Sequence, residues 1–180
     1  QEKVDLPLVT TKDMEKAMGL DKEGFRNRFF STLPHTTGDQ LLTKIFSVFN
    51  QRIPELGWLL YPGVEKGLHQ LSASHGLYIV SNCQEGYLQA FNQCTGLVDR
   101  YIQDFEYIGR SGKPKFQNII DVIDRNRLQS PIYIGDTQGD FDAAFKAGVD
   151  FGFAAYGLGQ VNRPTISFAN FEALVEFLQI

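Results

Sequence analysis

Two aspartates directly after a short apolar run are the residues of this 180-residue chain best placed to bind a metal ion. Gly135 and Asp136 follow the apolar run 132–134, and Asp140 lies four residues after Asp136. A glycine allows a tight exit from a strand, so both carboxylates would converge between the strand end and the next helix. Mg²⁺ takes one or two carboxylates together with water and substrate phosphate, so the pair suits that ion. The alternative interpretation is a turn residue and a helix N-cap.

Polar residues also follow two other apolar runs. Ser81 and Asn82 come after the run 77–80, where a hydroxyl and the backbone N–H groups of a helix start would bind an anion. Lys113 and Lys115 lie between the run 105–108 and the next helix, where a lysine would neutralise a phosphate. The simpler alternatives are an N-cap serine and a solvated basic loop.

The segments around these residues alternate between strand and helix patterns. Such alternation predicts an α/β fold: a Rossmann-like parallel sheet flanked by helices, with right-handed crossovers. In such sheets ligands bind at the carboxyl ends of the strands, so the serine, lysine and aspartate candidates should share one edge. The expected strands are 77–80, 105–108, 132–134 and 151–155, and the expected helices are 64–72, 86–93, 116–125, 140–147 and 171–178.

The first third of the chain has helical periodicity throughout. Helices are expected at 11–18, 21–30 and 37–49, with no strand pattern between them. We therefore expect a small helical cap over residues 1–58 and an α/β core over residues 59–180.

Composition excludes several classes of partner. The net charge of −4 and the absence of a Lys/Arg run argue against nucleic acid. No apolar stretch reaches the ~18 residues of a membrane span, and the first eleven residues contain no signal-peptide core. Cys83 and Cys94 do not form a CxxC pair. Such isolated cysteines are typical of proteins in a reducing cytoplasm. We expect a cytoplasmic protein, and the sequence leaves its oligomeric state open.

The order of these residues resembles a known family. Ser81, a lysine and then Gly135-Asp136-x-x-x-Asp140 are similar to motifs two, three and four of the haloacid dehalogenase superfamily. The stretches 81–87 and 135–140 look like its phosphoglycolate-phosphatase-like branch, and residues 61–64 resemble the cap-to-core junction there. The resemblance implies a magnesium-dependent phosphatase that hydrolyses a small phosphorylated metabolite through an aspartyl-phosphate.

The resemblance also implies roles for individual residues. Ser81 would bind the phosphoryl oxygens, with Asn82 beside it, and Asp136 would hold Mg²⁺ directly with help from Asp140. One lysine would stabilise the phosphoryl group. Lys113 precedes a proline, as in one form of the motif, whereas Lys115 matches the spacing of another form; both remain candidates, with a slight preference for Lys115.

One departure from the family pattern is large. The first motif, Asp-x-Asp-x-Thr after an N-terminal strand, is absent, and its first aspartate is the nucleophile. The acidic groups at 104–106, 121–124 and 140–142 are not placed at a free strand end. We expect that the first core strand is missing and that the chain is inactive by itself. The alternative is a catalytically dead domain that binds phosphate and metal, while the paired aspartates disfavour dehalogenation.

Overall fold

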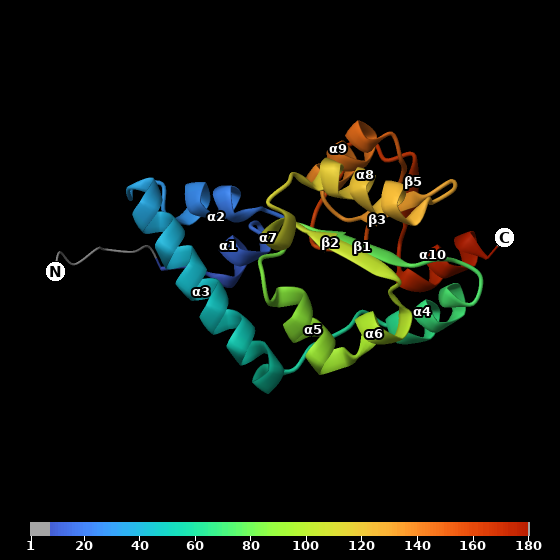
Figure 1. Cartoon of the computed structure of the whole chain (residues 1–180), viewed down its shortest axis with the longest axis horizontal. Coiled ribbons are helices and arrows are strands. Elements are labelled where there is room, and N and C mark those ends of the chain that lie inside the picture. The colour runs from blue at the N-terminus through green and yellow to red at the C-terminus, as the bar shows by residue number, and fades with distance from the viewer. Residues whose placement is uncertain (1–7, 180) are drawn as a thin grey trace.

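The computed structural model describes residues 8–179, and their first part is helical (Figure 1). Side chains set the starts of two of these helices: Thr10 and Asp13 form a capping box, and the Asp21 carboxylate accepts from Gly24 N–H. The rings of Phe25 and Phe46 pack edge to face, with their centroids 5.5 Å apart. The three helices are α1 (Thr11–Glu15), α2 (Lys22–Phe29) and α3 (His35–Leu56).

The rest of the chain alternates strands and helices, and the α/β prediction is confirmed. Its helices are α4 (Val64–Ser72), α5 (Tyr87–Thr95), α6 (Leu97–Tyr101), α7 (Ile108–Ser111), α8 (Lys115–Asn126), α9 (Gln138–Ala147) and α10 (Phe171–Leu178). Its strands are β1 (Tyr78–Ser81), β2 (Asp104–Tyr107), β3 (Ile132–Gly135), β4 (Asp150–Ala154) and β5 (Ile166–Phe168).

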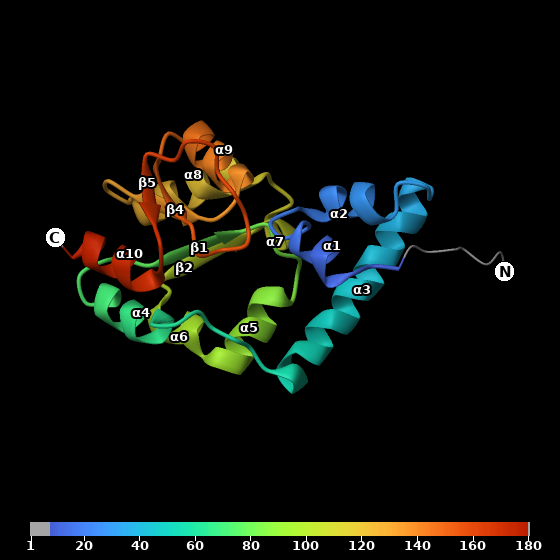
Figure 2. The same cartoon turned by 180° about the vertical axis from the view of Figure 1, so that it is seen from behind.

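Within residues 8–179 the strands form two separate parallel sheets, β1-β2 and β3-β4-β5. Helices α4, α5 and α6 lie on one side of β1 and β2, while α8 and α9 lie on the other (Figures 1 and 2). A single tyrosine links the two sheets, because the Tyr133 hydroxyl of β3 donates to the Val80 carbonyl of β1 at 2.8 Å. The expected edge of strand ends is therefore present, although the sheet is divided.

Several elements differ from the sequence prediction. Strand β5 was not expected, because three residues carry too little alternation to identify a strand. Ile108 was assigned to a strand but begins α7, and α9 begins at Gln138 instead of Asp140. No helix in the described part of the chain is long and apolar enough to cross a membrane.

Candidate active site

Asp140 lies at the start of α9 and organises the loop that leaves β3. It is the third residue of the helix, in a capping box with the N-cap Thr137. Its Oδ2 accepts from the Thr137 hydroxyl at 2.7 Å and from the backbone N–H groups of Thr137 and Asp136 at 3.0 and 3.3 Å. A Cβ at Gly135 would lie 2.5 Å from Asp140 Cβ, so this close approach requires a glycine. The Gly-Asp-x-x-x-Asp spacing thus has a steric and hydrogen-bonding basis.

Lys115, the first residue of α8, forms a buried ion pair with Asp140. Lys115 Nζ contacts Asp140 Oδ1, and the two side chains are only 10% and 7% exposed. Burial by itself raises the pKa of Asp140, but the charge of Lys115 and the hydrogen bonds from Lys115 and Thr137 outweigh it and lower the pKa below 3.8. Asp140 is therefore ionised at neutral pH, and Lys115 is fixed where β3 ends.

Asp136 points toward the loop that follows β4. Its Oδ2 accepts from Leu158 N–H at 2.9 Å and from Gly159 N–H at 3.3 Å. Side chains at Gly157 and Gly159 would collide with Asp136, since each added Cβ would lie 2.3 Å from one of its atoms. This loop positions Asp136, a role that sequence reasoning missed. The available signal was the pair of glycines one residue apart directly after a strand.

Ser81 ends β1, and Asn82 directly after it adjoins the helical first part of the chain. The Ser81 hydroxyl oxygen accepts from Cys83 N–H at 3.1 Å, which leaves its O–H free to donate. Asn82 Nδ2 donates to the Gly19 carbonyl at 2.9 Å. Gly19 has a φ of +82°, and a Cβ there would lie 2.9 Å from Thr137 Cγ2. One loop between α1 and α2 thus touches the ends of both β1 and β3.

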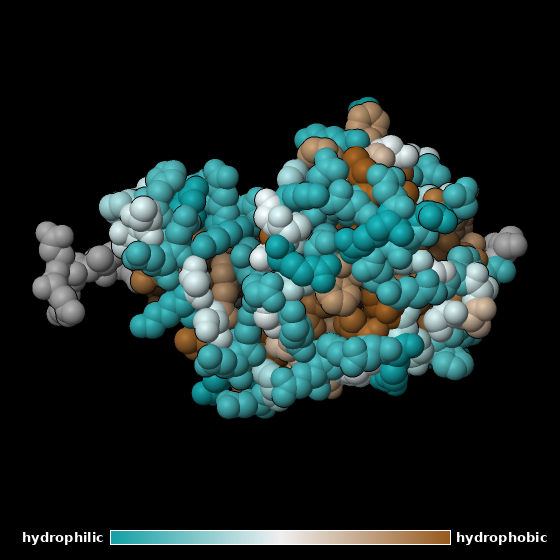
Figure 3. Space-filling model, in the orientation of Figure 1, coloured by the Kyte–Doolittle hydropathy of each residue, from teal (hydrophilic) through white to brown (hydrophobic). Residues whose placement is uncertain are grey.

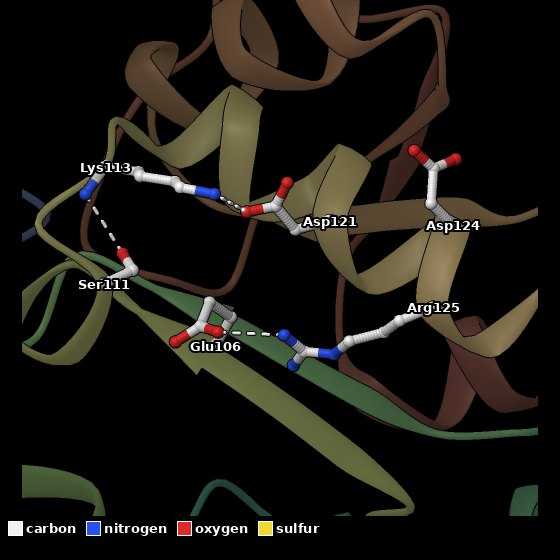
Figure 4. Close-up of a pocket in the computed structure, with 6 residues that line it drawn as sticks. All are labelled: Glu106, Ser111, Lys113, Asp121, Asp124 and Arg125. Carbon is white, nitrogen blue, oxygen red and sulfur yellow. Dashed lines mark hydrogen bonds and ion pairs between the residues drawn. The ribbon is translucent and has the colours of Figure 1, made fainter.

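Lys113 lies elsewhere. Its ammonium pairs with Asp121 Oδ2 at 2.6 Å, and its side chain is 51% exposed. Figure 4 shows this pair beside α8, with Glu106 of β2 nearby. These residues line a shallow charged hollow of about 680 Å³. The hydrogen bond from Arg110, against the opposing effect of burial and with help from Arg125, lowers the pKa of Glu106 in this hollow to about 2. The structure therefore brings Lys115, and not Lys113, together with Asp140.

The carboxylates of the site differ in their capacity to hold a metal ion. Residues 8–179 contain no cluster of three His, Cys, Asp or Glu side chains, so any ion would need ligands from water and substrate. Both oxygens of Asp140 already have donors. Asp136 Oδ1 takes no hydrogen bond from the described residues, whereas Oδ2 takes two. Asp136 is therefore the carboxylate that fits Mg²⁺, which commonly uses one or two protein carboxylates.

Comparison with known proteins identifies the family of the chain. The sequence model of the haloacid dehalogenase-like hydrolase family matches residues 1–154. The chain belongs to this family. The predicted resemblance to the haloacid dehalogenase superfamily is therefore confirmed. None of the curated protein sequences matches it.

Solved structures share the fold of this haloacid dehalogenase-like hydrolase at low sequence identity. A predicted phosphoglycolate phosphatase from Haemophilus somnus is 20% identical with a TM-score of 0.79, covering 99% of this chain and 86% of that one. A predicted phosphatase from Clostridium acetobutylicum is 16% identical with a TM-score of 0.80, covering 96% and 84%. The D,D-heptose 1,7-bisphosphate phosphatase of B. bronchiseptica, complexed with magnesium and phosphate, is 16% identical with a TM-score of 0.56, covering 71% and 87%.

Proposed function

We propose that this edge of the sheets is the active site of a magnesium-dependent phosphatase acting on a small phosphorylated metabolite. The observation that carries the proposal is the buried Lys115–Asp140 pair, which fixes a cation where β3 ends. Family membership and the solved structure of a phosphatase complexed with magnesium and phosphate support it. The similarity to a predicted phosphoglycolate phosphatase supports a substrate of that class.

Each residue has a role that follows from its chemistry. The Ser81 hydroxyl and the backbone N–H groups after β1 donate to phosphoryl oxygens. Lys115 supplies positive charge as negative charge develops on the transferring group, and Asp140 keeps Lys115 in place. Asp136 would hold Mg²⁺, which supplies charge neutralisation at the phosphoryl oxygens when bound. Asn82 would offer its backbone N–H, because its side chain is bonded to Gly19.

The reaction also needs a nucleophile. A carboxylate oxygen attacks phosphorus, the ester oxygen leaves with a proton from a general acid, and water then cleaves the acyl phosphate to restore the carboxylate. In the described part of the chain, the aspartates that follow the strand ends are Asp136 and Asp140, and both have other roles. The nucleophilic aspartate would therefore come from a strand outside residues 8–179. The competing proposal is a domain that binds phosphate and metal without catalysis.

The helical first part would act as a cap that selects substrate. The loop containing Gly19 lies against both strand ends, so a bulky phosphate ester would collide with it. This supports a small metabolite as the substrate. Free thiols at Cys83 and Cys94 are compatible with the proposed cytoplasmic location.

Phosphate binding and turnover test different parts of the proposal. A calorimetric titration of inorganic phosphate into residues 1–180 should show saturable binding that Mg²⁺ strengthens. Lys115→Met should weaken it at least tenfold, whereas the matched variant Lys113→Met should leave it unchanged, because Lys113 pairs with the partly exposed Asp121 instead of Asp140. Equal losses in both variants, or no effect of Mg²⁺, would count against this site.

Hydrolysis of p-nitrophenyl phosphate by the same chain should be absent with or without Mg²⁺. Metal-dependent turnover by residues 1–180 would show that the proposed need for an external nucleophile is wrong. A longer polypeptide that supplies Asp-x-Asp-x-Thr on a strand should be active. If it binds phosphate without turnover, the catalytically dead alternative is correct.

A further inference from the structure

The outer edge of β2 is the edge that faces away from β1. Within residues 8–179, β2 pairs only with β1, so no strand lies beside this edge. The register pairs Val80 with Glu106, and the Val80 carbonyl is turned away from β2, where it accepts from the hydroxyl of Tyr133. In a parallel ladder one residue of each register pair makes the hydrogen bonds between the strands, and here that residue is Glu106. The backbone groups of its neighbours Phe105 and Tyr107 therefore point outward.

Two carboxylates cover the outward N–H groups of β2. Asp104 Oδ1 accepts from the Phe105 N–H at 2.8 Å. Glu106 Oε1 accepts from the Tyr107 N–H at 3.1 Å. A strand that approached this edge would therefore find both of these donors already taken by side chains of β2 itself.

Two arginines cover the outward carbonyl that lies between these N–H groups. Arg110 of α7 and Arg125 of α8 both donate to the Phe105 carbonyl, Arg125 at 2.9 Å. The same arginines hold the carboxylates, because Arg110 Nε lies 2.8 Å from Glu106 Oε1. Arg125 lies 2.6 Å from Asp104 Oδ2 and 2.9 Å from Glu106 Oε2, and Figure 4 shows its guanidinium turned from α8 toward β2. Four charged side chains thus form one network that takes the three outward groups in the middle of β2.

The surface beside this sheet would favour an added strand if the edge were open. Ile79 of β1 and Ile102, which precedes β2, help to line an apolar hollow of about 700 Å³. Figure 3 shows apolar side chains gathered between the upper and lower helices. Arg110 also covers two aromatic rings of β2, with its guanidinium carbon 4.8 Å from the ring centroid of Phe105 and 5.3 Å from that of Tyr107. A free strand edge next to apolar surface is a place where chains pair and aggregate.

We propose that the network of Asp104, Glu106, Arg110 and Arg125 closes the outer edge of β2 to pairing with a second copy of this chain. A second copy is the partner that this edge would meet, because a two-fold axis beside an edge strand brings two identical strands together antiparallel. Pairing would break the network and leave charged groups without their partners, at a cost in free energy. The inference is independent of phosphatase chemistry, because it requires neither metal nor phosphate.

Removal of the arginines from residues 1–180 tests the proposal. Arg110→Met/Arg125→Met uncovers the Phe105 carbonyl, whereas Arg125→Met alone keeps Arg110 on it. The matched control is Arg100→Met, because Arg100 also pairs with a carboxylate, Glu65, and donates to the backbone carbonyls of residues 95 and 96, but beside helix α5 instead of at a strand edge. Sedimentation equilibrium should show that the double variant self-associates at least tenfold more tightly than the wild type. Arg125→Met should lie between the two, and Arg100→Met should match the wild type.

Hydrogen exchange locates the association and separates it from simple destabilisation. In the double variant, exchange at Phe105 and Tyr107 should slow as the protein concentration rises, because a strand of the second copy then covers these N–H groups. A network that only fastens α7 and α8 to β2 predicts faster exchange there at every concentration and no added self-association. That result, or equal self-association in Arg125→Met and Arg100→Met, would overturn the proposal. If the double variant does not fold, the comparison of these two single variants decides the question.

Discussion

Breaking the buried pair of Lys115 and Asp140 should have unequal effects depending on which partner is removed. In Asp140→Asn, the buried Lys115 side chain keeps its charge without a carboxylate partner, and the new amide N–H groups face the donors of Thr137. Loss of one partner from a buried pair costs about 3–5 kcal/mol in the free energy of unfolding. In Lys115→Met, Asp140 keeps its other donors, so we expect a loss of about 1–2 kcal/mol.

The double variant Lys115→Met/Asp140→Asn should be more stable than the sum of the single losses predicts, by about 1–3 kcal/mol, because residues in contact couple. Urea unfolding at pH 7 measures all four proteins, with Trp58 fluorescence and circular dichroism as independent probes. Trp58 is the only tryptophan in the sequence and packs on Phe91 with ring centroids 4.9 Å apart. Lys113→Met is the surface control and should change stability by less than about 1 kcal/mol.

The pH dependence supplies a further check on this pair. The pKa of Asp140 is lowered in the folded state, so its stabilising contribution is present above the unfolded value near 4 and is lost as the pH falls below it. Lys115→Met should reduce that acid loss, because the charge that lowers the pKa is gone. Additive single losses within about 0.5 kcal/mol, or an unchanged acid profile in Lys115→Met, would refute the assignment of Lys115 as the partner of Asp140.

Three other outcomes follow from the structure. Gly157→Ala should displace Asp136 and weaken Mg²⁺ binding by calorimetry, because its Cβ would lie 2.3 Å from Asp136 Cβ; normal binding would contradict this. The pKa of Glu106 is lowered to about 2, so wild-type stability should fall as the pH drops from 4.5 toward 2, by at most about 3 kcal/mol, and acid titration of Glu106→Gln should lack this loss. Asn82→Ala should speed hydrogen exchange of the loop around Gly19 while leaving urea stability nearly unchanged, because only one exposed hydrogen bond to that loop is lost. Unchanged exchange would show that the Asn82 side chain does not hold this loop in place.

The sequence predicted strands and their ends well because those features depend on local pattern. The apolar runs 77–80 and 132–134 lie within one residue of β1 and β3, and α4 and α10 have the predicted bounds. Apolar runs bounded by glycine and polar residues report directly on the period of a strand. For this reason the edge with Ser81 and Asp136 could be located before any coordinates were known.

Other features depend on tertiary structure and left no local signal. Lys113 and Lys115 are two residues apart at a helix start, and side chains at that spacing do not face the same way, so spacing alone could not choose between them. The contacts that hold Asp136 come from backbone N–H groups of residues 158 and 159, which any sequence possesses. The glycines that permit those contacts are informative only once the approach of the loop is known.

Tyr133 connects the end of β1 to the charged pair at the site. Its hydroxyl lies 2.8 Å from the Val80 carbonyl and 3.5 Å from Asp140 Oδ1, and burial raises its pKa, so it remains a neutral donor. A single hydroxyl cannot donate to both acceptors at once, and the shorter distance is the one to the Val80 carbonyl. Asp140 therefore depends on Lys115 and Thr137 for its donors, which is why the loss of Lys115 should be felt at this carboxylate.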